Sequence, residues 1–239
     1  MTQRLHGDLH THTLASGHAY GTIREMAQAA AEKDIHVLGI SEHGPGVPGT
    51  VDSIYFRNLT AVPRVLYGVT VLHGCEINLL PGGRLSLDER SLAMLDYGIV
   101  GIHRYCYEDQ GIVRNTDDMI ACMRNEKIKF VSHPDDNTTP LHYPALVEAA
   151  KQYGVALEVN NSSLYKPQRR VGCLDNYRSM LELCMQHGAN VVVSSDAHDP
   201  SAVGDHALAL ELLKRENFDF SLIINTDMDK ILRFLDITL

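Results

Sequence analysis

The feature that most constrains this chain is a histidine-rich stretch near its N-terminus, Asp-Leu-His-Thr-His-Thr-Leu-Ala-Ser-Gly-His at residues 8–18. Side chains alternate between the two faces of a β-strand, so His10 and His12 are expected to point the same way. Two imidazoles on one face can bind one divalent cation. Asp8 has the same parity and could orient a ligand histidine. A solvated strand end is the alternative, but the His-x-His spacing favours a metal site.

Strand-like and helix-like patterns alternate along the chain. Thr22 and Glu25 form a capping box, and Pro144 and Gly154 mark the start and end of another helix. About seven strands in about 240 residues suit a closed or nearly closed parallel barrel. We therefore predict one α/β domain over residues 1–239. Strands are expected at 36–41, 70–75, 96–102, 129–132, 155–159 and 190–195, with a short one at 222–225, and helices include 53–67, 86–95, 116–127 and 203–215.

Metal-binding residue types recur at the C-terminal ends of these predicted strands. In a parallel barrel those ends converge on one face, where the active site forms. Unrelated solvated loops would not be expected to repeat the pattern strand after strand. The residues are His10, His12, His43, Glu76, His103, His133, Asp196 and His198.

Composition excludes some classes of function. The net charge of −9 argues against a broad nucleic-acid or membrane-binding surface. No apolar run reaches the roughly 18 residues of a membrane span. The five cysteines form no CxxC pair, and the first residues lack a secretory apolar region. Reduced thiols and a cytoplasmic location are therefore expected.

Several motifs taken together resemble the polymerase and histidinol phosphatase (PHP) superfamily, over almost the whole length. The closest resemblance is to its small stand-alone bacterial phosphatases of the YcdX type, which Ala15-Ser-Gly-His-Ala-Tyr20 and Glu158-Val-Asn-Asn-Ser-Ser163 also fit. The motifs are Asp-Leu-His-Thr-His at 8–12, Ser-Glu-His at 41–43, Glu-Ile-Asn at 76–78, Gly-Ile-His at 101–103, Ser-His-Pro at 132–134 and Ser-Asp-Ala-His at 195–198.

The resemblance implies a distorted (β/α)7 TIM-like barrel with three divalent metal ions per chain. Zinc is the metal that we expect first. Manganese and iron remain alternatives, because imidazole and carboxylate ligands bind all three metals about equally well. A carboxylate has two oxygens, so Glu76 suits a bridging place. The implied ligands are His10, His12, Glu76 and Asp196 for one metal, Glu76, His103 and His133 for the second, and His18, His43 and His198 for the third.

Two positions depart from the family pattern. Glu42 stands before His43 where an aspartate is usual, and its extra methylene shifts any contact that this acid makes. Arg104 follows His103 where related proteins often carry an acidic residue, which places a cation at the rim. No family role is carried onto either position.

The implied reaction is hydrolysis of a small phosphomonoester by a metal-bound hydroxide. Glu76 and Asp196 are the expected catalytic residues, both as ligands first. The sequence offers no credible Ser-His-Asp or Cys-His arrangement. Arg104, Arg169 and Arg170 are candidate substrate-binding residues, with Lys166 and Arg57 as further candidates. A solvated basic loop explains the run at 166–170 equally well.

Three alternatives stay open. The same cluster could cleave diesters, as a phosphodiesterase or 3′-5′ exonuclease, although the charge argues against long nucleic acid. The chain could be a metal-stabilised scaffold without activity. It could be a carbon–nitrogen hydrolase of the amidohydrolase type, but the expected barrel lysine has no clear counterpart. A homo-oligomer is also left open.

Overall fold

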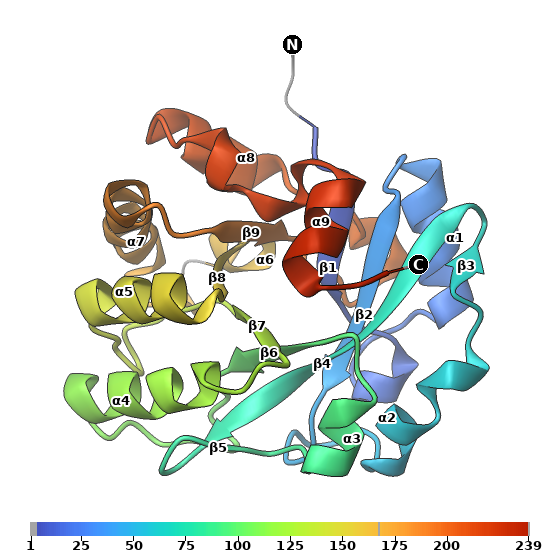
Figure 1. Ribbon diagram of the computed structural model, residues 1–239, viewed down its shortest axis with the longest axis horizontal. Coiled ribbons are helices and arrows are strands. Elements are labelled where there is room, and N and C mark those ends of the chain that lie inside the picture. Colours follow the sequence, from blue (N-terminus) through green and yellow to red (C-terminus); the bar gives the residue numbers. More distant parts are fainter. Residues whose placement is uncertain (1–3, 167, 239) are drawn as a thin grey trace.

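Seven parallel strands form a nearly closed barrel in the computed structural model, which describes residues 4–166 and 168–238 (Figure 1). Their order around the sheet is β1-β2-β4-β6-β7-β8-β9, so chain neighbours are also sheet neighbours. Two short antiparallel strands, β3 (Val65–Leu66) and β5 (Arg84–Leu85), pair with β4. The parallel strands are β1 Gly7–Thr11, β2 Val37–His43, β4 Val69–Leu80, β6 Tyr97–Gly101, β7 Ile128–Val131, β8 Ala156–Asn160 and β9 Val191–Ser194.

Helices cover the outside of this barrel, and the expected end signals are present. The predicted capping box joins Thr22 and Glu25 at the start of α1. Gly154 ends α5 in the left-handed conformation that glycine adopts without strain. The α-helices are α1 Ile23–Glu32, α2 Ile54–Arg57, α3 Glu89–Ala93, α4 Ile112–Met123, α5 Tyr143–Tyr153, α6 Asn161–Leu164, α7 Cys173–His187, α8 Ala207–Arg215 and α9 Met228–Leu235. Single 3₁₀ turns are η1 Leu14–Ser16, η2 Leu59–Ala61, η3 Pro200–Ala202, η4 Phe220–Leu222 and η5 Ile224–Thr226.

A side chain helps to close the seam between β1 and β9. One isolated parallel bridge joins Thr11 to Ala197 at the top of this seam. Below it, Asn225 is fully buried and donates through Nδ2 to the carbonyls of Gly7 and Val193, both at 2.7 Å. The amide of Val193 donates back to Asn225 Oδ1. Asn225 thus supplies hydrogen bonds that a regular strand pair would otherwise make.

Some expected elements differ in the structure. The strand predicted to end at Glu76 continues to Leu80, because Ile77 and Leu79 extend the buried apolar pattern. The helix expected at 86–95 is reduced to α3, and the one expected at 116–127 begins earlier, at Ile112. The short strand expected at 222–225 is replaced by 3₁₀ turns, in which the side chain of Asn225 does the pairing.

Apolar side chains fill the N-terminal part of the barrel interior, and polar side chains fill its C-terminal end. Tyr97 and Phe130 pack edge to face inside the barrel. Helix α9 covers the N-terminal end of the barrel and lies beside β1 (Figure 1), with Ile231 packed close to Gly7. The histidines therefore gather at the opposite end, where the strands finish. Among the described helices, none combines the length and apolar character needed to cross a membrane.

Candidate metal centre

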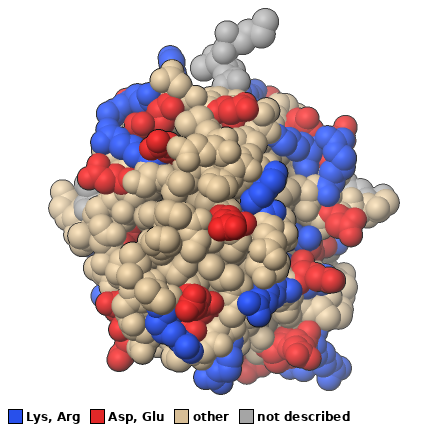
Figure 2. Space-filling view, turned by 60° about the vertical axis from the view of Figure 1, so that its left-hand side comes forward, with Lys and Arg blue, Asp and Glu red and all other residues tan. Residues whose placement is uncertain are grey.

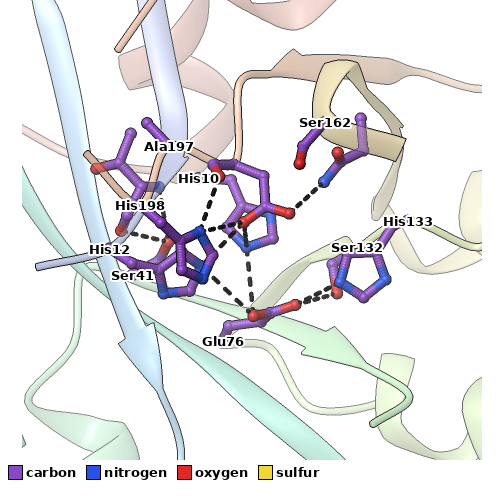
Figure 3. Close-up of polar contacts among 12 residues, drawn as sticks. His10, His12, Ser41, Glu76, Ser132, His133, Ser162, Ala197 and His198 are labelled. Atoms are coloured by element: carbon purple, nitrogen blue, oxygen red, sulfur yellow. Dashed lines mark hydrogen bonds and ion pairs between the residues drawn. The ribbon is translucent and has the colours of Figure 1, made fainter. Parts of the chain in front are cut away.

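All nine predicted metal-binding residues come together at the C-terminal end of the barrel. The extra length of β4 keeps Glu76 inside a strand, and most of the others stand at strand ends or in the loops that follow. Figure 3 shows His10, His12 and His198 on one side of Glu76, with Ser132 and His133 on the other. The nine are His10, His12, His18, His43, Glu76, His103, His133, Asp196 and His198.

Glu76 stands at the middle of the cluster and divides it into two groups. Its Oε2 lies 3.3 Å from His10 Nε2, 3.6 Å from His12 Nε2 and 2.8 Å from His43 Nδ1. Its Oε1 lies 3.3 Å from His103 Nε2 and 2.8 Å from His133 Nε2. Each oxygen therefore faces its own set of imidazoles, as a carboxylate between two cations would.

Asp196 faces the first of these groups from the opposite side. Its Oδ1 lies 3.3 Å from His12 Nε2 and 3.7 Å from His10 Nε2. The residue has a positive φ of 55°, an uncommon conformation that turns the chain sharply after β9. Strain of this kind is concentrated at functional sites. Here it places Asp196 and His198 beside the same histidines.

His18 completes a third group at the outer edge. Its Nε2 lies 3.3 Å from His198 Nε2, and its ring stacks 4.9 Å from that of His43. Three triads have donor atoms within 4.8 Å of one another: His12, His43 and His198; His10, His12 and Glu76; and His43, Glu76 and His103. His43 therefore faces both the expected second group and the third.

Hydrogen bonds to neighbouring groups fix which ring nitrogen faces inward in four of the histidines. Ser16 Oγ donates to the acceptor-only carboxylate of Glu42 at 2.6 Å, so it must accept from His12 Nδ1 at 3.0 Å. The amide of His43 also donates to Ser16 Oγ. His12 therefore keeps its proton on Nδ1 and turns the Nε2 lone pair toward Glu76 and Asp196. Glu42, the departure from the family pattern, reaches His12 through this hydroxyl.

The same logic applies to three further histidines. Asn78 uses its Nδ2 as a donor to the carbonyls of Gly44 and Pro45, so its Oδ1 accepts from His103 Nδ1 at 2.7 Å. His198 Nδ1 lies 3.0 Å from the carbonyl oxygen of Asp196. His10 Nδ1 lies 2.7 Å from Glu158 Oε1. Hydrogen bonds of this type orient metal ligands in proteins generally.

Glu158 is the main residue that sequence reasoning missed. Besides His10, its buried carboxylate accepts from the amide of His133 at 2.7 Å and from Asn160 Nδ2 at 3.1 Å. It thus joins a ligand candidate on β1 to one after β7. A signal was present, because a glutamate inside the apolar run of residues 155–159 needs a buried partner.

The expectation for Asp8 is wrong. The strand register shifts between Asp8 and Thr11, so simple alternation fails there. Asp8 accepts from the amide and hydroxyl of Ser195 and from the amide of Gly204, and it lies 3.8 Å from His206. It therefore anchors the loop that carries Asp196 and His198. His206 is buried against this carboxylate.

The buried ionisable side chains of the cluster shift one another's pKa values. Burial alone would raise the pKa of Glu76, but His103, His10 and His43 lower it well below its usual range. The pKa of Asp196 would likewise be raised by burial, but His10, His12 and His198 lower it well below its usual range. Burial would lower the pKa of His10, yet the carboxylates of Glu158, Glu76 and Asp196 raise it well above its ordinary value. Glu76 and Asp196 are therefore anionic and attract cations or protons.

The donor atoms fit divalent cations. In the described part of the chain, His10 Nε2, His12 Nε2, His43 Nδ1 and Glu76 Oε2 are buried and lack a hydrogen bond. Buried polar atoms without partners are rare and call for an explanation. Imidazole nitrogens and carboxylate oxygens converging at these distances are the ligands that zinc and similar metals take. A cation at each group would satisfy these atoms.

A cavity of about 550 Å³ opens beside the cluster. Arg104, Arg169 and Arg170, the three predicted substrate-binding residues, all line it. Arg170 is mostly buried, and its Nε lies 3.5 Å from the buried carboxylate of Asp135. Burial would lower the pKa of Arg170, but Asp135 raises it above the usual value. A permanently charged guanidinium is thus held in the wall of the cavity.

Comparison with known proteins identifies the family. The PHP domain model matches residues 8–162. The chain belongs to the PHP family. Two curated relatives, both named "probable phosphatase", come from Clostridium novyi and Caldanaerobacter subterraneus subsp. tengcongensis. The first is 38% identical and the alignment covers 95% of this chain and 93% of the relative; the second is 37% identical over 98% and 92%.

A solved structure shares this fold. The histidinol phosphate phosphatase from Lactococcus lactis, solved with zinc, L-histidinol and phosphate, superimposes with a TM-score of 0.61 at 14% identity. The alignment covers 89% of this chain and 94% of that one. The predicted TIM-like PHP barrel and the predicted family are therefore confirmed.

Proposed function

We propose that the protein is a phosphatase that hydrolyses a small phosphomonoester at a centre of three divalent cations. The membership of the PHP family and the curated relatives named as phosphatases support phosphoester hydrolysis. One observation supports the placement of two cations: the two oxygens of Glu76 face separate sets of histidines, and on the Oε2 side the facing ring nitrogens of His10, His12 and His43 are buried without a hydrogen bond. The close approach of His18 to His198 and His43 at the outer edge supports the third.

The proposed cation sites follow these groups. His10, His12, Glu76 and Asp196 would hold one cation, Glu76, His103 and His133 a second, and His18, His43 and His198 a third. We expect zinc first, with manganese or iron as alternatives. When bound, the cations would lower the pKa of a water molecule toward neutrality and neutralise charge on the phosphoryl oxygens.

The protein's own residues would orient the substrate and keep the ligands in their binding form. Ser16, Asn78 and Glu158 hold protons on the outer ring nitrogens of His12, His103 and His10. Arg104, Arg169 and Arg170 would bind the phosphoryl oxygens or another anionic group of the substrate. The acidic and basic side chains interspersed on the face in Figure 2 agree with a small substrate rather than a long nucleic acid.

The first test is metal content by elemental analysis, with p-nitrophenyl phosphate turnover on the same sample. We expect close to three metal ions per chain and turnover of the monoester. Glu76→Gln should lose metal and activity together, because an amide offers one neutral oxygen where the carboxylate serves two groups. Full metal content with full activity in this variant would refute the bridging role. Bound metal without turnover of any phosphoester would favour a scaffold.

The arginines can be tested separately. Arg169→Ala with Arg170→Ala should raise KM for p-nitrophenyl phosphate roughly 10–100-fold, because charge-assisted hydrogen bonds contribute about 1.5–3 kcal/mol. Metal content should stay the same. Arg90→Ala, on the exposed surface of α3, is the control for loss of one positive charge. An unchanged KM in the double variant would mean that this loop is only a solvated basic segment.

A further inference from the structure

A second cavity opens on another side of the metal centre. Its volume is about 560 Å³, similar to the 550 Å³ of the cavity that holds the arginines. His18, Asp196 and His198 line both cavities, so both reach the same edge of the cluster. The first extends toward the loops after β6 and β7, and the second toward α6 and the segment between β9 and α8. Each has the size of a small-molecule site in its own right.

The two cavities differ in chemistry. The lining of the first includes apolar side chains, Ile102, Met119 and Leu141 among them, besides its arginines. The second is lined mainly by residues with polar side chains, from α6 and from the segment before α8. The first therefore suits an apolar or aromatic body beside an anion, and the second suits a group that hydrogen bonds in several directions.

Both donors and acceptors are available in the second cavity. Lys166 Nζ donates to Ser162 Oγ at 2.7 Å, which holds the ammonium at the cavity wall and leaves further protons for a ligand. Tyr165 donates to Asp205 at 3.1 Å, both residues line this cavity, and the exposed Asp199 lines it as well. One ammonium among three carboxylates, those of Asp196, Asp199 and Asp205, does not favour a second phosphate. The set matches a neutral group rich in hydroxyls.

One turn of the chain supplies the basic residues of both cavities. The amides of Arg169 and Arg170 donate to the carbonyl of Lys166, which folds the segment after α6 on itself. Lys166 lies in the second cavity, while the two arginines lie in the first. Figure 3 shows Ser162, on α6, close to the edge of the cluster. A phosphorus atom at the cluster would therefore have a formed site on either side.

We propose that the second cavity is a subsite for a second ester substituent that carries several hydroxyls, such as a glyceryl or sugar group. The protein would then also cleave phosphodiesters of this class, an inference that rests on the proposed phosphoester chemistry. A monoester has one organic substituent and would leave one cavity without a ligand group. In the diester reaction, water oxygen bonds to phosphorus and the bond to the leaving oxygen breaks. The two protons of water end on the leaving alcohol and the product monoester, without any redox change.

Three substrates with one leaving group test this proposal on the zinc-reconstituted enzyme. They are p-nitrophenyl phosphate, methyl p-nitrophenyl phosphate and glyceryl p-nitrophenyl phosphate, which differ only in the second substituent. We expect kcat/KM for the glyceryl diester to exceed that for the methyl diester at least tenfold. As a measurement independent of turnover, glyceryl phenylphosphonate should bind more tightly than methyl phenylphosphonate in calorimetry.

Variants assign the effect to the cavity. Lys166→Met should reduce the glyceryl-to-methyl ratio of kcat/KM at least fivefold, and Tyr165→Phe should reduce it less. Lys214→Met, on the exposed face of α8, should leave the ratio unchanged. Equal kcat/KM for the two diesters, or cleavage of the monoester alone, would overturn the subsite and leave the proposed phosphatase intact. Failure on all three substrates with metal bound would overturn both proposals.

Discussion

At the scale of single residues, cation binding depends on the protons held by the outward-facing ring nitrogens of the histidines. A neutral imidazole has one protonated and one free nitrogen, and only the free one can bind a cation. For His12, the choice is made by Ser16, whose only proton is committed to Glu42. Glu42 also accepts from the amide and hydroxyl of Thr13, so the loop after β1 is folded around this carboxylate. Glu42 can therefore stand where an aspartate is usual, because it acts on His12 through the hydroxyl of Ser16.

Ser16→Ala should lower metal affinity roughly 10–100-fold, the usual cost of losing a partner that orients a ligand. The variant removes the acceptor for His12 Nδ1 and leaves the Glu42 carboxylate without one donor. Affinity would be measured by competition with a chromophoric chelator. Ser221→Ala, at an exposed serine on η4, is the matched control. Equal affinity in the wild type and Ser16→Ala would show that the tautomer of His12 is set elsewhere.

The sequence predicts those residues of the metal centre that lie in short motifs, but not the contacts between residues far apart along the chain. The nine ligand candidates could be found because each falls in a short motif at the end of a predicted strand or in the segment that follows it. The residues that orient them could not, because Glu158 and His10 are 148 positions apart and meet only in the folded barrel. Asp8 shows the opposite error, where parity along one strand overlooked a register shift. Arg170 was found from charge, but its partner Asp135 needed the fold.

At the scale of elements, the barrel is held closed where regular strand pairing is weakest. Strands β1 and β9 do not pair with each other, and an isolated bridge joins Thr11, at the end of β1, to Ala197, in the loop after β9. Asn225 replaces strand pairing below it with three buried hydrogen bonds to Gly7 and Val193. The sequence pattern suggested a strand at 222–225, because it cannot show that a side chain will do the pairing. The seam fixes β1 relative to β9, and so His10 relative to Asp196.

Asn225→Ala should therefore destabilise the fold by about 2–4 kcal/mol, because it leaves the buried amide of Val193 and two carbonyls without partners. Urea denaturation followed by circular dichroism would measure the change. Asn58→Ala, at an exposed position whose side chain makes no capping hydrogen bond, should change stability much less. A loss in Asn225→Ala no larger than in this control would mean that the seam is held by packing alone.

At the scale of the whole molecule, the fold concentrates buried negative charge at one end of the barrel. Glu76, Glu158 and Glu42 are fully or almost fully buried, and Asp196 joins them at the upper face. Buried carboxylates are costly unless protons or cations compensate them. Histidine protons and metal ions can both do so, and they compete for the same nitrogen atoms. Metal binding should therefore be coupled to proton release over the whole cluster.

The direction of this coupling follows from His10. Its pKa is raised well above the ordinary 6.5, so protein stripped of metal carries a proton on Nε2 at neutral pH. A cation must displace that proton, hence zinc affinity should rise as the pH increases from 6 toward and through the raised pKa. Chelator competition at several pH values, corrected for the chelator's own protonation, would measure it. Glu158→Gln removes a carboxylate that raises this pKa, so its affinity should level off at lower pH. An affinity independent of pH in the wild type would mean that His10 Nε2 holds no proton for the metal to displace.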